Sequence, residues 1–185
     1  MIETLLESHL ATESFASKLA PFLVAPFVVG LKGDIGSGKT TFVRALLRAL
    51  KVQDNIKSPT FSIVETYTLP DSNIDFHHFD LYRIDDDKGE SLALIGFSDY
   101  FTDQSICCIE WPERSKKTMK MVDLLLEFYW LPEGRRVVVT ACSSKAKLLF
   151  ATKPKNQAVG WALAQHAFED GRVYNKAENP SVKSL

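Results

Sequence analysis

The chain has 185 residues, of which 45% are hydrophobic and 24% charged, a composition typical of one compact domain with a continuous core. Its 22 basic and 23 acidic residues nearly cancel, which gives a formal net charge of −1. This balance argues against a protein that binds nucleic acid mainly by itself, because such proteins usually carry a basic excess. We therefore expect any role on nucleic acid to be indirect, through a partner.

The cysteines and the apolar stretches indicate a cytoplasmic protein with no membrane segment. Cys107, Cys108 and Cys142 show neither the spacing of a disulfide framework nor that of metal ligands, so we expect reduced, buried thiols. Glutamates at positions 3, 7 and 13 argue against a signal peptide. The longest apolar stretch, residues 19–31, is too short for a membrane span and contains two prolines.

The first third of the chain predicts helix, strand and helix in succession. Residues 12–23 show helical periodicity, with Thr12 as the expected N-cap. Residues 27–31 form an uninterrupted apolar run of strand length, as expected for a parallel strand buried on both sides. A helix is predicted over residues 40–50, after a glycine-rich loop.

The rest of the chain predicts mostly strands, which together with the alternation before them indicates an α/β core of mixed strand direction. Single strands are expected at residues 61–68, 74–80, 106–110 and 147–151, and a short helix at residues 88–95. Residues 122–130 and 135–142 are predicted to pair as an antiparallel hairpin. Residues 158–168 are amphipathic, and the polar tail from residue 175 is expected to be mobile.

The glycine-rich loop satisfies the pattern G-x-x-x-x-G-K-[ST] in full. It consists of Gly33, Asp34, Ile35, Gly36, Ser37, Gly38, Lys39 and Thr40. Glycines there allow positive φ, so that successive N–H groups point at phosphate oxygens. Lys39 supplies a cation for the β- and γ-phosphates, the Thr40 hydroxyl suits magnesium, and the helix that follows adds its dipole. Because the loop lies between a strand and a helix, we expect binding of a nucleoside triphosphate, ATP, with Mg²⁺.

This loop sets the expected fold class. The fold is expected to be a P-loop NTPase-like mixed sheet flanked by helices, with an antiparallel hairpin near its C-terminal end. Residues 1–150 would form the P-loop ATPase domain, and residues 151–185 a partly helical extension with a mobile tail.

Two acidic residues at strand ends are candidates to complete a magnesium site. Glu110 and Asp80 each end an apolar strand, so burial of the strand delivers them to the edge of the sheet where ligands bind in such folds. A phosphate loop needs such a carboxylate to hold the magnesium shell or to orient water. The alternative for each is an exposed acid that caps the next turn.

Three other features admit two interpretations each. The turn Ser58-Pro59-Thr60 either senses a γ-phosphate or simply begins the next strand. Trp111 either stacks on a partner at the rim of the site or covers the core. His77 and His78 point to opposite faces of a strand, so they do not readily bind one metal together and structural roles are favoured.

Five sequence blocks, taken in order, resemble one known family. They are residues 33–42, in which Thr41 and Phe42 follow the loop, and the segments Lys57-Ser58-Pro59-Thr60-Phe61, His78-Phe79-Asp80-Leu81-Tyr82-Arg83, Ile95-Gly96-Phe97-Ser98-Asp99-Tyr100-Phe101 and Ile109-Glu110-Trp111-Pro112-Glu113. Together they resemble TsaE, formerly called YjeE, the bacterial ATPase family required for threonylcarbamoyladenosine modification of tRNA. The resemblance covers roughly residues 5–150.

The resemblance implies an activity and partners that the residues alone do not reveal. Members of this family bind ATP, hydrolyse it slowly and act with TsaD and TsaB, the pair that transfers the threonylcarbamoyl group. Thr40 and Glu110 would then be the magnesium ligands, with Asp80 close to the metal, and Lys39, Asp80 and Glu110 would be the catalytic residues. Contact with tRNA would be indirect.

The resemblance also implies roles for peripheral residues. Ser58, Pro59 and Thr60 would form a switch-like segment, and Trp111 would lie in a second one. The adenine would rest near residues 9–12, which include His9 and Ala11. Thr41 would join the nucleotide-binding residues of the loop, and Arg135 would approach the nucleotide.

Three rival functions differ from a partner-dependent ATPase in what they require. A small-molecule kinase usually has an arginine-rich lid, and no such cluster occurs between residues 81 and 130. A binding module would need nucleotide for association but would release no phosphate. A GTPase is disfavoured, because Asn175-Lys176-Ala177-Glu178 has Glu where the guanine signature N-K-x-D needs Asp.

Overall fold

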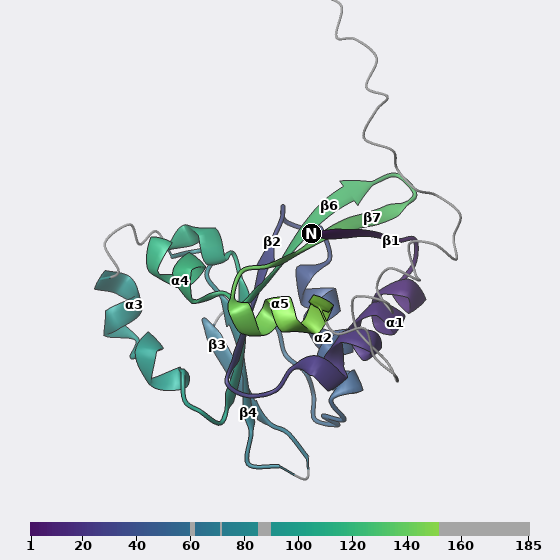
Figure 1. Ribbon diagram of the computed structural model, residues 1–185. Coiled ribbons are helices and arrows are strands. Elements are labelled where there is room, and N and C mark those ends of the chain that lie inside the picture. Colours follow the sequence, from purple (N-terminus) through teal and green to yellow (C-terminus); the bar gives the residue numbers. More distant parts are fainter. Residues whose placement is uncertain (60–61, 71, 85–89, 152–185) are drawn as a thin grey trace, which may run out of the picture.

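The computed structural model describes residues 1–59, 62–70, 72–84 and 90–151 (Figure 1). These residues build one mixed sheet of seven strands in the order β1-β7-β6-β2-β5-β4-β3. The strands are β1 (Ile2–Leu6), β2 (Phe27–Lys32), β3 (Val64–Thr68), β4 (Asp75–Asp80), β5 (Ser105–Glu110), β6 (Leu124–Leu131) and β7 (Gly134–Ala141). The predicted α/β class, with a mixed sheet and a hairpin of β6 and β7, is confirmed.

The four central strands, β6, β2, β5 and β4, run parallel to one another. Their apolar runs are explained by this position, because a parallel strand with helices on both faces meets no solvent. Residues Phe27–Lys32 of β2 are buried except for the last one. Parallel direction brings the carboxyl ends of β2, β5 and β4 to one edge, where Leu31 pairs with Glu110 and Glu110 with Asp80.

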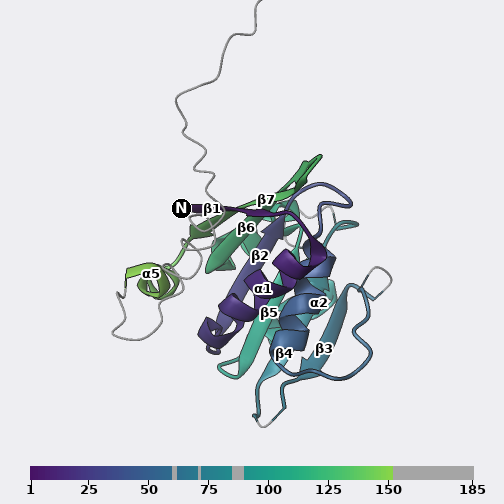
Figure 2. The ribbon, with the colours of Figure 1, turned by 90° about the vertical axis from the view of Figure 1, so that its right-hand side faces the viewer.

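Helices cover both faces of the sheet (Figures 1 and 2). On one face lie α1 (His9–Leu19) and α2 (Lys39–Ala49); on the other lie α3 (Glu90–Leu94) and α4 (Lys116–Met121). Short 3₁₀ helices, η1 (Ala20–Phe22), η2 (Phe97–Tyr100) and η3 (Pro112–Arg114), join these elements. Two hydrophobic clusters result, and alternate residues of β5 divide between them: Ile106 and Cys108 belong to one, Cys107 and Ile109 to the other.

Phe42 ties α2 to the core beside the loop. Its buried ring lies 5.6 Å from that of Phe15 on α1 and 5.7 Å from that of Phe128 on β6, measured between centroids. We expect Phe42→Ala to lower the free energy of unfolding by about 3–5 kcal/mol, because a cavity replaces these contacts. Urea denaturation measures the change. The control Leu10→Ala alters a side chain of α1 that is 75% exposed and should cost less than about 0.5 kcal/mol; similar losses for both would contradict the prediction.

The first helix begins earlier than the sequence pattern indicated. Ser8 is its N-cap: the Ser8 hydroxyl oxygen accepts a hydrogen bond from the Ala11 N–H at 3.1 Å. Thr12, predicted as the cap, lies inside the helix and donates its own hydroxyl to the Ser8 carbonyl at 3.3 Å. The predicted cap was therefore wrong by one turn.

Two strand predictions near the chain ends were also wrong. β1 was not predicted; it pairs antiparallel with β7, from Ile2 opposite Val139 to Leu6 opposite Arg135. Residues 147–151, predicted as a strand, belong instead to α5 (Ser144–Ala151). Ser143 supports this helix, because its hydroxyl oxygen accepts a hydrogen bond from the Ala146 N–H at 3.2 Å.

Two further elements differ from the predictions: α4 was not predicted, and β3 begins at Val64 rather than at residue 61. Cys107 and Cys108 are buried as expected, but Cys142 is exposed. Among the described residues, every helix is too short or too polar to cross a membrane. The amphipathic segment 158–168 and the tail lie outside the described residues.

Candidate functional site

The glycine-rich loop connects β2 to α2 at the edge where the central strands end. Gly33, Gly36 and Gly38 all have positive φ, at 141°, 76° and 106°, as predicted for backbone that turns its N–H groups inward. Gly38 is the N-cap of α2, and its carbonyl accepts the first helical bond from the Phe42 N–H at 2.9 Å. The loop therefore presents the N-terminal end of an 11-residue helix, which favours an anion.

Two of these glycines differ in how closely they are packed, which yields a prediction. A Cβ on Gly33 would lie 2.4 Å from the Phe128 carbonyl oxygen, whereas a Cβ on Gly36 would meet nothing within 4 Å. We expect Gly33→Ala to lower the free energy of unfolding by about 2–5 kcal/mol, through steric overlap added to backbone strain. Gly36→Ala, which adds strain alone, should cost about 1 kcal/mol. Thermal and urea denaturation of both variants check this, and equal losses would contradict it.

Lys39 lies at the start of α2 with its ammonium group inside the loop. It is buried, and its Nζ donates hydrogen bonds to the carbonyl oxygens of Gly33 at 2.6 Å and Asp34 at 2.9 Å. Burial lowers the pKa of Lys39, while the charges of Glu110, Asp80, Glu113 and Asp34 oppose that shift. The side chain is thus a cation held by its own loop and surrounded by carboxylates.

Thr40 and Glu110 meet directly, although they are 70 residues apart in sequence. The Thr40 hydroxyl donates to Glu110 Oε1 at 2.7 Å. A second contact reaches the same oxygen: His78 Nε2 lies 2.9 Å from it. Glu110 is thus a buried carboxylate with partners on two other elements, α2 and β4, and the predicted alternative of an exposed cap is wrong for it.

Asp80 ends the neighbouring strand and pairs in register with Glu110. Its Oδ1 accepts a hydrogen bond from the Tyr82 N–H at 3.0 Å. The pKa of Asp80 is raised, chiefly by burial and further by the nearby Glu110 charge, while the Tyr82 N–H, His78 and Lys39 act in the opposite direction. Asp80 therefore both caps the following turn and lies beside the proposed site.

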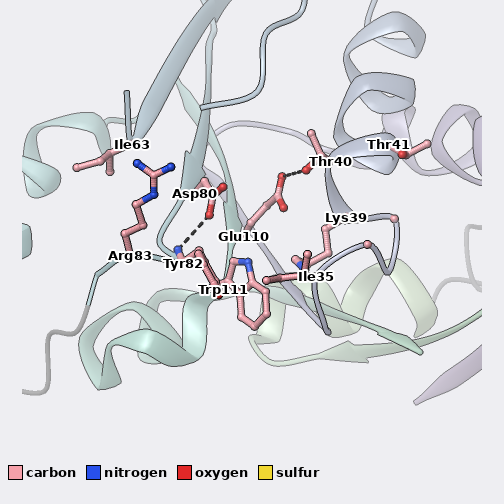
Figure 3. Close-up of a pocket in the computed structure, with 12 residues that line it drawn as sticks. Ile35, Lys39, Thr40, Thr41, Ile63, Asp80, Tyr82, Arg83, Glu110 and Trp111 are labelled. Atoms are coloured by element: carbon pink, nitrogen blue, oxygen red, sulfur yellow. Dashed lines mark hydrogen bonds between the residues drawn. The ribbon is translucent and has the colours of Figure 1, made fainter. Parts of the chain in front are cut away.

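A cavity of about 400 Å³ joins these groups (Figure 3). It is lined by Ile35, Gly36, Gly38, Lys39, Thr40, Thr41, Ile63, Asp80, Tyr82, Arg83, Glu110 and Trp111. Figure 3 shows the Asp80 and Glu110 carboxylates between Thr40 on one side and Arg83 on the other. The structure thus brings together, in one cavity, the loop residues and the two strand-end acids that the sequence predicted.

Trp111 covers the Lys39 side of this cavity. The Lys39 ammonium lies 4.1 Å from the centroid of the Trp111 ring, close enough for a cation–π contact. Trp111 has a φ of 60°, which is rare for a bulky residue, and its ring also packs 5.1 Å from that of Tyr82. Trp111 thus lines the cavity and also packs against the second hydrophobic cluster, and its stacking on a partner stays a prediction.

A second cavity, of about 220 Å³, lies on the other side of the loop. It is lined by Leu6, Glu7, Ser8, His9, Thr12, Ser37, Gly38, Thr41, Phe128, Gly134 and Arg135. His9 and Arg135 thus reach this cavity, whereas Ala11 does not line it. Arg135 also supports the loop, because its Nε donates to the Ser37 carbonyl at 3.0 Å and its Nη2 to the Gly36 carbonyl at 3.3 Å.

The predicted switch segment is described only in part. Ser58 and Pro59 lie between α2 and β3, and the Pro59 carbonyl accepts a hydrogen bond from the Ile63 N–H at 3.1 Å. Ile63, which follows this segment, has a φ of 65° and lines the larger cavity. Thr60 lies outside the described residues.

Sequence reasoning missed two residues near the site. His78 was assigned a structural role, but it contacts Glu110. Arg83 was not singled out, yet it lines the larger cavity opposite Thr40 (Figure 3). The parallel pairing of β4 and β5 was the signal that could have found His78, since it places residues 78 and 110 diagonally on one face.

The side chains alone do not make a closed metal site. Within the described part of the chain, no group of three His, Cys, Asp or Glu side chains is placed to hold a metal ion. A cation at Thr40 and Glu110 would need further oxygen ligands from water or from a bound phosphate. Mg²⁺ is commonly held in this way, by one or two protein oxygens.

The comparisons with known proteins agree with one another. The family model "Threonylcarbamoyl adenosine biosynthesis protein TsaE" matches residues 6–137. The tRNA threonylcarbamoyladenosine biosynthesis protein TsaE of Haemophilus influenzae is 36% identical over 138 residues, covering 72% of this chain and 85% of the relative. The Aquifex aeolicus TsaE protein is 37% identical over 138 residues, covering 74% and 92%.

A longer alignment and a solved structure extend this similarity. The TsaE protein of Nostoc is 33% identical over 155 residues, covering 83% of this chain and 94% of the relative. The crystal structure of YdiB from Bacillus subtilis superposes with a TM-score of 0.61 at 22% identity, covering 89% of this chain and 93% of YdiB. The structural match supports the fold.

Proposed function

This chain belongs to the TsaE family, and from that premise we propose that it is a Mg²⁺-dependent ATPase required for threonylcarbamoyladenosine modification of tRNA, acting on the TsaD–TsaB complex. The observation that carries the proposal is the contact of Thr40 with Glu110 at 2.7 Å, beside a complete phosphate loop. It joins a hydroxyl at a helix N-terminus to a carboxylate at a strand end, and both are hard oxygen ligands of the kind that Mg²⁺ prefers.

The loop residues are proposed to bind the phosphates. The backbone N–H groups of residues 33–41 and the α2 dipole would attract the triphosphate, in line with the positive φ of the three glycines. Lys39 would exchange its bonds with the Gly33 and Asp34 carbonyls for phosphate oxygens. Its buried position would make this cation effective against charge that develops during phosphoryl transfer.

Thr40 and Glu110 are the proposed ligands of the ion. Because the Thr40 hydroxyl donates its proton to Glu110, the lone pairs of its oxygen remain available for a cation. When bound, Mg²⁺ would supply positive charge that neutralises the phosphate oxygens. Asp80, whose pKa is raised, would lie beside the ion and its waters and orient an attacking water molecule.

The remaining residues are proposed to bind the adenine or to respond to the nucleotide and the partner. The smaller cavity, with His9 and Arg135 in its lining, is proposed to hold the adenine, and Ala11 is a more distant neighbour of it. Ser58, Pro59, Thr60 and Trp111 are proposed to respond to the nucleotide and to the partner. Slow intrinsic turnover is expected, since phosphoryl transfer often needs an arginine supplied by a partner.

The deciding experiment is ATP hydrolysis measured for the protein alone and with TsaD, TsaB and tRNA. We expect slow phosphate release alone and a stimulation of about tenfold or more in the complex. Equal turnover in both conditions would contradict partner dependence. Phosphorylation of a metabolite without any response to TsaD and TsaB would instead support a kinase, and nucleotide-dependent complex formation without phosphate release would support a binding module.

A further inference from the structure

His78 and Glu110 form a buried polar pair at the base of the site. Their side chains are 0% and 4% exposed. They come from adjacent parallel strands, with His78 opposite Cys108 and Asp80 opposite Glu110. Because residues two apart share a face of a sheet, His78 lies diagonally next to Glu110, on the α2 side.

The two bonds to Glu110 converge on a single atom. An ionised carboxylate only accepts hydrogen bonds, so His78 Nε2–H and the Thr40 hydroxyl both donate to Oε1, at 2.9 and 2.7 Å. Neither bond involves Oε2. The side chain is therefore fixed through one oxygen, and the carboxylate lines the cavity between Thr40 and Asp80 (Figure 3).

The two donors differ in how firmly they are held. Thr40 belongs to the helix turn that follows the glycine loop, a segment that must accommodate any ligand. His78 belongs to β4, which is hydrogen-bonded on both sides, to β3 and β5. His78 is therefore held by the sheet rather than by the loop.

We propose that His78 is a positioning residue, which orients the Glu110 carboxylate from the neighbouring strand β4 and thereby sets the affinity of the site for Mg²⁺. This inference rests on the proposed function. Residues that hydrogen-bond a metal ligand orient it, and their removal typically weakens metal binding about 10–100-fold.

His77 provides a matched control on the same strand. It is also buried, but its side chain points to the opposite face, where Nδ1 lies 2.9 Å from Thr66 Oγ1 and the ring packs 5.0 Å from that of Tyr100. His77→Leu removes a buried imidazole from the same strand without touching Glu110.

The test measures ATP binding, by calorimetry or by tryptophan fluorescence, at increasing concentrations of Mg²⁺. ATP binding in EDTA, without Mg²⁺, is the second readout. For His78→Leu we expect a Mg²⁺ requirement raised about 10–100-fold and ATP binding in EDTA changed less than about twofold. The amide of His78→Gln can still donate a hydrogen bond near the position of Nε2. We therefore expect this variant to keep most of the wild-type affinity for Mg²⁺ that His78→Leu loses. His77→Leu should follow the wild type.

Each outcome is decisive. Suppose that a folded His78→Leu or His78→Gln variant loses ATP binding equally in EDTA and in Mg²⁺: the role of His78 would then be purely structural. Unchanged Mg²⁺ dependence in His78→Leu would also overturn the proposal. If His78→Leu does not fold, failure of His78→Gln to bind Mg²⁺ better than a Glu110→Gln variant overturns it. Absence of Mg²⁺-dependent ATP binding in the wild type would overturn the proposed function itself, which separates the two failures.

Discussion

Replacement of Lys39 by Ala is expected to lower ATP turnover in the TsaD–TsaB complex by about 10²–10³-fold, the usual cost of losing one preorganised positive donor. The ammonium group is held between the loop carbonyls and the Trp111 ring, and water that fills the space left by alanine carries no positive charge to replace it. Phosphate release at saturating ATP measures the loss. Binding of a fluorescent ATP analogue should weaken in parallel.

The control for Lys39→Ala removes a different cation from the same helix. Arg44 is exposed on α2, five residues beyond Lys39, and Arg44→Ala should leave turnover within about twofold because a solvated charge contributes little. Turnover of Lys39→Ala within threefold of the wild type would contradict the assignment of this lysine. So would an equal loss in both variants.

The second large effect is expected from Glu110→Gln, which keeps the shape of the side chain and removes its charge. Turnover should fall by about 10²-fold or more, because an amide is a weaker ligand for a divalent cation than a carboxylate and leaves the phosphate charge less neutralised. Added Mg²⁺ should recover part of the loss. Glu113→Gln, an exposed acid three residues further on, should retain most of the activity.

A double-mutant cycle tests whether Thr40 and Glu110 act as one unit. Their hydrogen bond of 2.7 Å predicts strong coupling. We therefore expect Thr40→Val combined with Glu110→Gln to lose little more activity than the worse single variant, as for catalytic groups that act together. Losses that multiply would indicate two independent roles and would contradict a shared ion.

The elements around the loop were predictable because their signals are local. The apolar run of β2, the glycines and the periodicity of α2 follow one another within about 25 residues. Together they match the strand, loop and helix that a phosphate loop requires. Glu110 and Asp80 were found because they end buried strands. Their proximity follows from parallel pairing, which the alternation of helices and strands already indicated.

The elements missed were those whose stability depends on distant partners. β1 has only five residues, and its strand character comes from pairing with β7, about 130 residues away. The short apolar run at residues 148–151 suits either a strand or a helix, and the helix is favoured by the Ser143 cap and by Lys145, which pairs with Asp123 at 2.7 Å. The role of His78 depends on one diagonal contact, which no single-strand pattern reveals.

The pairing of β1 with β7 has a consequence for folding during synthesis on the ribosome. Arg135, which donates to the loop carbonyls, is made 98 residues after Ser37, a delay of roughly 5–20 s at ordinary rates of translation. Until then the first strand has no neighbour to complete its edge of the sheet, and the loop lacks its arginine support. The edge of the sheet and the arginine support of the loop are thus completed only after β7 has been made, so we expect a chain truncated before β7 to hold the glycine-rich loop less firmly.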